Sequence, residues 1–442
     1  MSSRDQFTSK IGFILAAAGS AIGLGAIWKF PYMAGTNGGS VFIILFVICT
    51  VLIGLPILIA EFMIGRRGQK DPITSFKEQA PNKPWFMIGW IGLVACGLIL
   101  SFYSVVGGWI LSYILRAVSF SLTGQGVDFS TLFSEIISNP WEVLIAQAAF
   151  MLLTLFIVQA GIKNGIETAS KWMMPILFLF FILLFIRSIT LDGAMEGVKF
   201  MFIPDWSYLN GDTLMLALGQ AFFSLSIGVA AMITYASYLS KKEKIVTSAV
   251  NVASMNIAIS LLAGLVIFPA VFALGFSPTE GPGLVFIMIP AVFEQLPFGG
   301  FLLLVFFILL LFATVTSAIA LLEVVVSIGI REKTAQRKKA SWLLASIIFV
   351  IGIPSALSFG ILSDITIFER SIFDFVDYVT SAILMPIGAF LTSIFAGYYY
   401  TKKISREEML ASPVVYNCWL FIVRYVAPLS IAAIFINKVF FS

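Results

Sequence analysis

The sequence predicts an all-α polytopic membrane protein with about eleven transmembrane helices in one domain. Of its 442 residues, 60% are hydrophobic and only 11% are charged, which is too little charge to cover the surface of a soluble protein of this length. Apolar runs of about 20 residues, long enough to cross a hydrocarbon core of about 30 Å, recur along the whole chain. These runs are continuously apolar rather than alternating, which predicts helices and not a barrel.

The apolar runs define the predicted spans in chain order, with polar or helix-breaking residues between them. The spans are 9–34, 40–65, 86–116, 141–160, 169–190, 213–239, 245–275, 298–330, 340–358, 371–399 and 414–437.

The basic residues predict the orientation of the chain. Most of the 27 Lys and Arg residues fall on one side of the spans, the side that holds the N-terminus, and this side is expected to be cytoplasmic. An odd number of spans then places the C-terminus outside, whereas one missed or split span would reverse that end. The predicted location is the cell membrane, with lipid as the surrounding partner.

Composition also excludes several classes of function. The chain has no histidine, which removes the commonest metal ligand and proton shuttle. Its three cysteines, Cys49, Cys96 and Cys418, lie far apart in apolar runs and lack metal-ligand spacing. No nucleophile–base constellation and no phosphate-binding or nucleic-acid-binding motif is present. An enzyme and a nucleic-acid partner are therefore not expected.

Two spans carry helix-breaking residues at mid-membrane depth. The first span contains Gly19, Gly23 and Gly25, and each glycine weakens a helix by about 1 kcal/mol relative to alanine. The sixth span has the small and polar stretch at 222–228, which ends in Gly228. Close packing of small residues is the alternative explanation for one such span. Breaks in both spans indicate a transport site, because unwound backbone offers carbonyl and N–H groups to an ion or a ligand.

Spans one and six correspond in a five-plus-five inverted repeat. Repeat one is expected over about 9–190 and repeat two over about 213–399, with an extra helix at about 414–437. All of these segments belong to one transporter domain, 1–442.

Several motifs distributed over nearly the whole chain resemble the neurotransmitter:sodium symporters, and specifically their bacterial LeuT-type members. The motifs are Gly19 to Gly25 with Trp28-Lys29-Phe30-Pro31, Asn37-Gly38-Gly39, residues 54–65 around Glu61, Ser101-Phe102-Tyr103 with Trp109, residues 220–228 with 234–238, and residues 313–318. The resemblance implies the LeuT fold, with helices 1 and 6 broken, and sodium-coupled symport of amino acids.

The resemblance implies two sodium sites. Site two would use the carbonyls of Gly19, Ile22 and Ala313 and the hydroxyls of Thr316 and Ser317. The alternative for these hydroxyls is a bond to the preceding helical turn. Site one would use Ala21, Ser224, Asn256 and the substrate carboxylate. The family normally adds a side-chain amide where this chain has Ala26, so the sodium stoichiometry stays open, and Asn256 could instead join two helices.

The resemblance also implies an amino-acid site between the two breaks. Gly23 replaces the aspartate of amine-transporting relatives and leaves room for a carboxylate carried by the ligand. That carboxylate would meet the N–H groups of Leu24 and Gly25 and the hydroxyl of Tyr103, which could otherwise be an interfacial aromatic. The ammonium would meet Ala21, Phe223, Ser224 and Ser226. The apolar pocket would be formed by Ile99, Phe102, Phe223, Val229, Ala318 and Leu321, which predicts a hydrophobic or aromatic amino acid.

The family's gates correspond to charged and aromatic positions of this chain. Lys29 and Asp377 match the outer ion pair, with Tyr103 and Phe223 as a lid beneath it. Arg4 and Phe7 match the inner gate near Tyr238, but Arg331 stands where the family has the acid that pairs with Arg4. Glu332 is the neighbouring acid. Gly165 and Pro175 match a pattern that lets span five unwind.

Chloride dependence is left open by the residues that correspond to the family's chloride site, which here are Phe46, Gln220, Ser224, Asn256 and Ser260. The absence of an acid at Ser260 favours a chloride ion, whereas Phe46 in place of a tyrosine argues against it. The sequence thus predicts import of amino acids by alternating access. The alternative is a substrate-gated sensor or channel of the same fold. Neither the oligomeric state nor the particular amino acid follows from these residues.

Overall fold

A computed structural model describes residues 5–119, 122, 127–276, 281–331 and 334–440. Within these residues, nine helices are long and apolar enough to cross a membrane. They are Ser40–Gly68, Pro84–Val118, Pro140–Gln159, Ile162–Ile189, Ile245–Ala273, Gly299–Ile330, Arg337–Leu357, Ile372–Tyr399 and Pro413–Val439. These helices match nine of the predicted spans, so the expected all-α polytopic architecture is confirmed.

The other two predicted spans are the broken ones. In the first, α1 (Lys10–Ala21) and the segment Gly25–Thr36 meet at 53°. In the sixth, α11 (Gly211–Ser224) and α12 (Ala231–Ala236) are separated by turns and bends at 225–230. Both interruptions fall at the glycine-containing stretches that predicted them.

The spans are built of regular α-helical parts, and some of them also contain π-helical turns. The α-helical parts are α2 (Phe30–Thr36), α3 (Ser40–Cys49), α4 (Leu55–Gly68), α6 (Met87–Val118), α8 (Pro140–Gln159), α9 (Thr168–Ile189), α13 (Ile245–Ala273), α15 (Gly299–Ile330), α16 (Arg337–Leu357), α17 (Ile372–Tyr378), α18 (Met385–Ile394), α20 (Pro413–Phe421) and α21 (Ala427–Phe440). The π-helical turns are Gly25–Lys29, Thr50–Gly54, Ile162–Glu167, Val379–Leu384, Phe395–Tyr399 and Ile422–Val426. The fifth span therefore begins at Ile162, earlier than the predicted 169.

Short elements occupy the connections between the spans. They are α5 (Pro72–Gln79), α7 (Phe129–Ser138), α10 (Ala194–Phe202), α14 (Met288–Glu294), α19 (Lys402–Met409), the 3₁₀ turns Pro84–Phe86, Trp206–Tyr208, Gly281–Leu284 and Thr334–Gln336, and the antiparallel strands β1 (Thr366–Ile367) and β2 (Arg370–Ser371). Asp128 begins α7 by accepting hydrogen bonds from the N–H groups of Ser130 and Thr131. The Thr131 hydroxyl and these N–H groups hold the pKa of the Asp128 carboxyl below its usual range.

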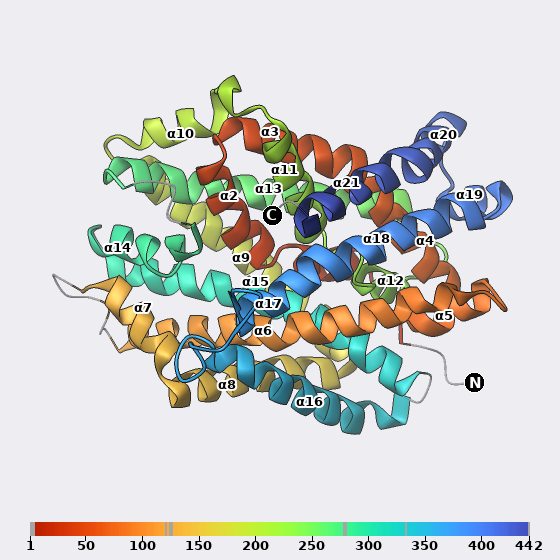
Figure 1. The fold of residues 1–442 in the computed structure, drawn as a ribbon, viewed down its shortest axis with the longest axis horizontal. Coiled ribbons are helices and arrows are strands. Elements are labelled where there is room, and N and C mark those ends of the chain that lie inside the picture. Colours follow the sequence, from red (N-terminus) through yellow and green to blue (C-terminus); the bar gives the residue numbers. More distant parts are fainter. Residues whose placement is uncertain (1–4, 120–121, 123–126, 277–280, 332–333, 441–442) are drawn as a thin grey trace.

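The helix α15 lies at the centre of the molecule and contacts α6, α8, α9, α16 and α1 (Figure 1). Most of its residues are buried, including Ala313, Thr316 and Ser317. Figure 1 shows α6, α8 and α16 along one side of α15, while α3, α10 and α13 lie along the other. The broken segments α1 and α12 both contact α15, so the two interruptions lie beside the most buried long helix.

Candidate functional site

The first helix breaks where its backbone approaches two hydroxyl groups. The last residue of α1 is Ala21, and Gly23 lies in the interruption. A Cβ on Gly23 would lie 2.3 Å from Ser317 Oγ and 2.6 Å from the Tyr103 hydroxyl oxygen. Only glycine allows this approach, so the space that the sequence predicted at Gly23 is bounded by two polar groups.

The sixth helix breaks through three residues in the left-handed region. Ser226, Gly228 and Ala230 have φ angles of 53°, 86° and 60°. The fully buried carboxyl of Glu61 accepts a hydrogen bond from the Gly228 N–H at 2.8 Å. This bond satisfies a backbone group that lipid could not satisfy, so Glu61 stabilises the interruption.

Hydroxyl groups of α15 converge on the carbonyls at the end of α1. Thr316 Oγ1 lies 3.0 Å from each of the carbonyls of Gly19, Ala313 and Phe312, so it contacts both the end of α1 and the preceding turn of its own helix. Ser317 Oγ donates to Gly19 and Ser20 at 3.2 and 3.1 Å. The structure thus brings together four of the five residues predicted for sodium site two and adds Ser20. The fifth residue, Ile22, caps α1 through its N–H, which donates to Ala18 at 2.7 Å.

This cluster suits a hard monovalent cation. Its oxygens are neutral carbonyls and hydroxyls, and the side chains of Thr316 and Ser317 are 2% and 7% exposed. Carbonyl and hydroxyl oxygens are the ligands that such cations prefer. A sodium ion among these oxygens would replace the hydroxyl–carbonyl bonds, because a hydroxyl that coordinates a cation turns its lone pairs toward it.

The residues predicted for sodium site one also lie together. Asn256 Nδ2 donates to the carbonyls of Ala21 and Ser224, both at 3.1 Å, and Ser224 Oγ donates to Asn256 Oδ1 at 3.1 Å. Asn256 therefore ties α13 to both interruptions. Ala26 is fully buried and adds no side-chain oxygen.

A cavity of about 40 Å³ separates the two interruptions. The Tyr103 hydroxyl accepts a hydrogen bond from the Leu24 N–H at 3.1 Å, and the Ser226 hydroxyl donates to the Ser20 carbonyl at 3.0 Å. The lining residues are Ser20, Ala21, Gly23, Leu24, Gly25, Ile99, Tyr103, Phe223, Ser226, Val229, Ser317, Leu321 and Met385. Most of the predicted substrate-binding residues are among them.

The observed lining differs from the predicted one: Ser224, Ala318 and Phe102 do not line this cavity, and Ser20, Ser317 and Met385 are additional. Ser224 does not line the cavity because its hydroxyl is bonded to Asn256. Ala318 is fully buried and does not line it either. Met385 of α18 was not predicted, and no local pattern distinguishes it from other apolar residues of its span. Phe102 lines the wider cavity described next.

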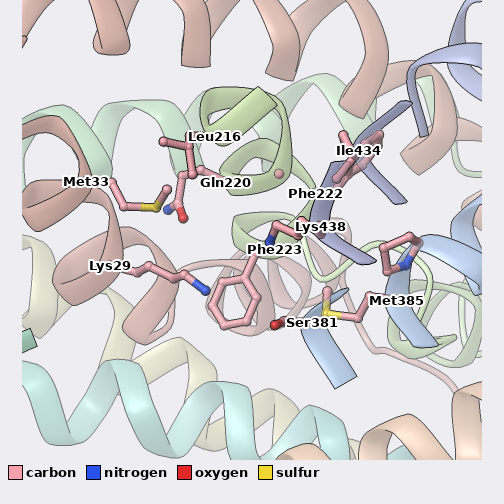
Figure 2. Close-up of a pocket in the computed structure, with 12 residues that line it drawn as sticks. Lys29, Met33, Leu216, Gln220, Phe222, Phe223, Ser381, Met385, Ile434 and Lys438 are labelled. Carbon is pink, nitrogen blue, oxygen red and sulfur yellow. The ribbon is translucent and has the colours of Figure 1, made fainter. Parts of the chain in front are cut away.

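A wider, largely aromatic cavity of about 360 Å³ lies beyond Tyr103 and Phe223, which line both cavities. Lys29 and Asp377 both line it, as expected of an outer gate. Among the described residues no ion pair joins these two side chains, and the Lys29 ammonium lies 4.3 Å from the centroid of the Phe223 ring instead. Figure 2 shows Lys29 directed toward this ring. We refer to this wider cavity as the vestibule.

At the other end of the molecule, a buried ion pair fastens the helices together. Arg337 of α16 forms a bidentate pair with Glu323 of α15, and Arg337 also donates to the Val158 carbonyl. The Tyr238 hydroxyl donates to Glu323 at 2.6 Å. Phe7 packs edge-on against the Tyr238 ring, and its N–H donates to the Tyr238 carbonyl at 3.2 Å.

The sequence left the acidic partner in the inner gate open, and the structure shows the Arg337–Glu323 ion pair in this region. Arg4 and Glu332 lie outside the described residues. Arg331 begins the turn after α15, and its side chain is exposed. Sequence analysis counted Arg337 among the basic residues of the cytoplasmic side and did not predict its ion pair. Two features could have indicated it: Arg337 lies next to a predicted span, and Glu323 lies within the preceding span.

Span five carries the predicted unwinding pattern close to the hydroxyl cluster of Thr316 and Ser317. Gly165 lies in the π-helical turn Ile162–Glu167, and Pro175 lies inside α9. A Cβ on Gly19 would lie 3.2 Å from Met174 Sδ, so the residue before Pro175 packs against this cluster. Glu167 accepts hydrogen bonds from the N–H and hydroxyl of Thr8 at 2.7 and 2.6 Å, which ties this turn to the start of α1.

The residues predicted for chloride have mixed surroundings. Gln220 Nε2 donates to the Gly25 carbonyl at 2.6 Å, while Gln220 Oε1 and Ser260 Oγ are buried and have no hydrogen-bond partner among the residues that the structure describes. Ser224 and Asn256 are bonded to each other. A buried Ser260 hydroxyl that lacks a partner is compatible with an anion, but the Gln220 oxygen is not.

Comparisons with known proteins agree with this geometry. The model of the sodium:neurotransmitter symporter family matches residues 4–132 and 128–441. A Bacillus subtilis (strain 168) protein named as an uncharacterized sodium-dependent transporter, YhdH, is 50% identical and covers 98% of this chain and 97% of its own. A similarly named Haemophilus influenzae protein is 37% identical over 99% of this chain and 98% of its own. The crystal structure of MhsT in complex with L-phenylalanine superposes with a TM-score of 0.92 at 44% identity, over 98% of this chain and all of that one.

Proposed function

Since this chain belongs to the sodium:neurotransmitter symporter family and is a sodium-dependent transporter of the membrane, we propose that it imports amino acids with apolar or aromatic side chains by sodium symport. The observation that carries this proposal is the cavity between the two interruptions. One end of it holds backbone and hydroxyl groups, and the other is apolar.

The polar end of the cavity supports a zwitterionic substrate. The N–H groups after the first interruption begin the helical segment Gly25–Thr36, and a helix start attracts a carboxylate. The Tyr103 hydroxyl lies beside them and would donate to that carboxylate. At the end of α11, Phe223 lines the cavity, and its carbonyl would favour an ammonium. Gly23 leaves the carboxylate to be supplied by the substrate.

The apolar end supports a hydrophobic or aromatic side chain. Ile99, Val229, Leu321 and Met385 line it, and each exposes little surface to solvent. Burying such a substrate side chain contributes about 1.5–3 kcal/mol. The related MhsT structure contains L-phenylalanine, which supports an aromatic substrate for this chain as well.

The hydroxyl cluster around Thr316 supports sodium as the driving ion. The ion would join the end of α1 to the middle of α15, so it would stabilise the arrangement that forms the substrate cavity. Reciprocity then requires sodium to tighten substrate binding and substrate to tighten sodium binding. The membrane potential adds about 2.3 kcal/mol per charge per 100 mV to inward transport.

The two ends of the molecule support alternating access, with the N-terminus in the cytoplasm. The vestibule leads to the cavity from the side of Lys29, whereas the Arg337–Glu323 pair and Phe7 cover the opposite side. Import would close the Lys29–Asp377 gate first and release the inner contacts afterwards. Unwinding near Gly165 would then let water reach the sodium cluster.

The proposal is tested by uptake into proteoliposomes. Purified protein is reconstituted, and a panel of radiolabelled amino acids is offered with and without an inward sodium gradient, in chloride and in gluconate. Sodium-dependent accumulation of apolar or aromatic amino acids is expected. Comparing uptake in chloride with uptake in gluconate shows whether transport requires chloride. Accumulation independent of sodium would contradict the cation site. Binding without accumulation would favour a substrate-gated sensor.

A further inference from the structure

Lys438 places a second ammonium group beside the outer gate. It lies in the last turn of α21, and its Nζ and Cε are 3.7 and 3.8 Å from the position that a Cβ would take on Gly219 of α11. Its backbone carbonyl accepts a hydrogen bond from the Tyr378 hydroxyl at 3.3 Å, which ties α21 to α17. In Figure 2, Lys29 and Lys438 approach Phe223 from different helices.

Two cavities connect Lys438 with the gate residues. Lys29, Ser381 and Lys438 line a small cavity of about 30 Å³ beside Phe223. Lys29, Asp377 and Lys438 line a larger and more polar cavity of about 440 Å³. The gate carboxylate and both ammonium groups therefore share one space, and the extra helix α21 contributes one of the three charges.

Two of the other charged residues that line the larger cavity, Asp374 and Arg370, have contacts of their own. Asp374 accepts a hydrogen bond from the Ser371 hydroxyl at 2.7 Å, and the Arg370 guanidinium lies 4.3 Å from the Tyr378 ring centroid. Asp377 lines this cavity together with Lys29 and Lys438, so it is a carboxylate that both lysines can approach.

Lys29 and Lys438 both line the cavity that Asp377 lines, so the two ammonium groups would compete for its carboxylate. Charge interactions are stronger here than in water because membrane helices surround the site. The carboxylate forms its shortest charge-assisted contact with one ammonium at a time, and the two like charges repel each other. In this structure Lys29 lies over the Phe223 ring and is not paired with Asp377, which leaves the vestibule open.

We propose that Lys438 is a second cation of the outer gate, which competes with Lys29 for Asp377 and thereby favours the open vestibule. When Asp377 turns to Lys438, Lys29 stays on the Phe223 ring. When Asp377 turns to Lys29, the gate closes over the cavity. The inference rests on the proposed transport function, because it describes which residues favour the open or the closed state of that transporter's outer gate.

The test measures how accessible the vestibule is, without requiring a substrate. Ile137 lines the vestibule and is half-buried, so Ile137→Cys serves as a reporter in a background with Cys49→Ala, Cys96→Ser and Cys418→Ser. The rate of labelling by N-ethylmaleimide is measured in reconstituted full-length protein, with and without sodium. The variants are Lys438→Met, Lys438→Arg, Lys29→Met, Asp377→Asn and the double variant Lys438→Met/Asp377→Asn.

Lys438→Met is expected to slow labelling about fivefold, because Asp377 then closes on Lys29, and Lys29→Met is expected to speed it. Lys438→Arg keeps the charge and should label like the parent. The double variant should match Asp377→Asn alone. The matched control is Lys199→Met, which removes an exposed lysine of α10 and should change nothing.

Two results would overturn the proposal. One is a labelling rate in Lys438→Met that equals the rate of the parent. The other is that Lys438→Met slows labelling by the same factor in the Asp377→Asn background as in the parent. Slowing by Lys438→Arg as well would show that charge is not the cause and would also overturn it. If sodium leaves the parent's rate unchanged, the proposed sodium coupling fails, while the comparison among variants still decides the role of Lys438.

Discussion

The hydroxyl of Tyr103 in α6 accepts a hydrogen bond from the backbone N–H of Leu24 at 3.1 Å. This bond joins the third span to the interruption in the first, at a residue that is 5% exposed and lines the cavity between the interruptions. In the proposed function it leaves the hydroxyl proton available to a substrate carboxylate. The proposed binding site therefore depends on one side chain and one backbone group that are remote in sequence.

Tyr103→Phe should weaken amino-acid binding about tenfold or more with little effect on folding, because a hydrogen bond to a charged group contributes about 1.5–3 kcal/mol. The measurement is the Kd of the transported amino acid in sodium. Tyr113→Phe is the control, since Tyr113 lies on the same helix and its buried hydroxyl donates to the Phe286 carbonyl instead. Equal losses in both variants would show that Tyr103 acts through packing only.

Gly23→Ala should abolish binding and transport, because its Cβ would lie 2.3 Å from Ser317 Oγ and 2.6 Å from the Tyr103 oxygen. Uptake in proteoliposomes measures this loss. Gly97→Ala provides the comparison, since nothing lies within 4 Å of a Cβ at that position. Normal uptake by Gly23→Ala would contradict the close approach on which the site depends.

Thr316→Val should raise the sodium concentration for half-maximal uptake about tenfold or more, since it removes a ligand while keeping the side-chain shape. A charge-assisted contact of about 1.4 kcal/mol corresponds to this factor. Thr314→Val is the matched control, because the Thr314 hydroxyl lies on the same helix and donates to the Leu310 carbonyl of its own preceding turn. An unchanged sodium dependence in Thr316→Val would remove Thr316 from the cation site.

Arg337→Met should lower the free energy of unfolding by about 3–5 kcal/mol, because it leaves the fully buried Glu323 carboxylate without its cation. It should also favour the inward-facing state, which faster substrate efflux would report. Replacing both partners, as in Glu323→Gln/Arg337→Met, should recover most of the stability. Removing the exposed pair Lys199–Glu196 should cost less than about 1 kcal/mol. A mild effect of Arg337→Met alone would show that the pair does not close the inner side.

Much of this protein follows from local sequence. Length and apolar runs predicted the spans, and the glycines near Gly23 and Gly228 predicted both interruptions, because helix propensity and membrane crossing depend on consecutive residues. The resemblance placed Thr316, Ser317, Asn256 and Tyr103 in one region. The short helices α7, α10 and α14 were not predicted, since their segments are too short for a strong periodic signal.

The tertiary structure alone decided which side chains meet. Met385 reaches the cavity, Arg337 pairs with Glu323, and Lys438 lies beside the outer gate because of how helices remote in sequence pack. A membrane span tolerates an ionisable residue when another segment supplies its partner, and that partner is not encoded next to it. The sequence by itself therefore predicted the membrane spans and where two of them break. Only packing determined which charged side chains meet, such as Arg337 and Glu323 at the inner side, because such a pair is a property of two helices at once.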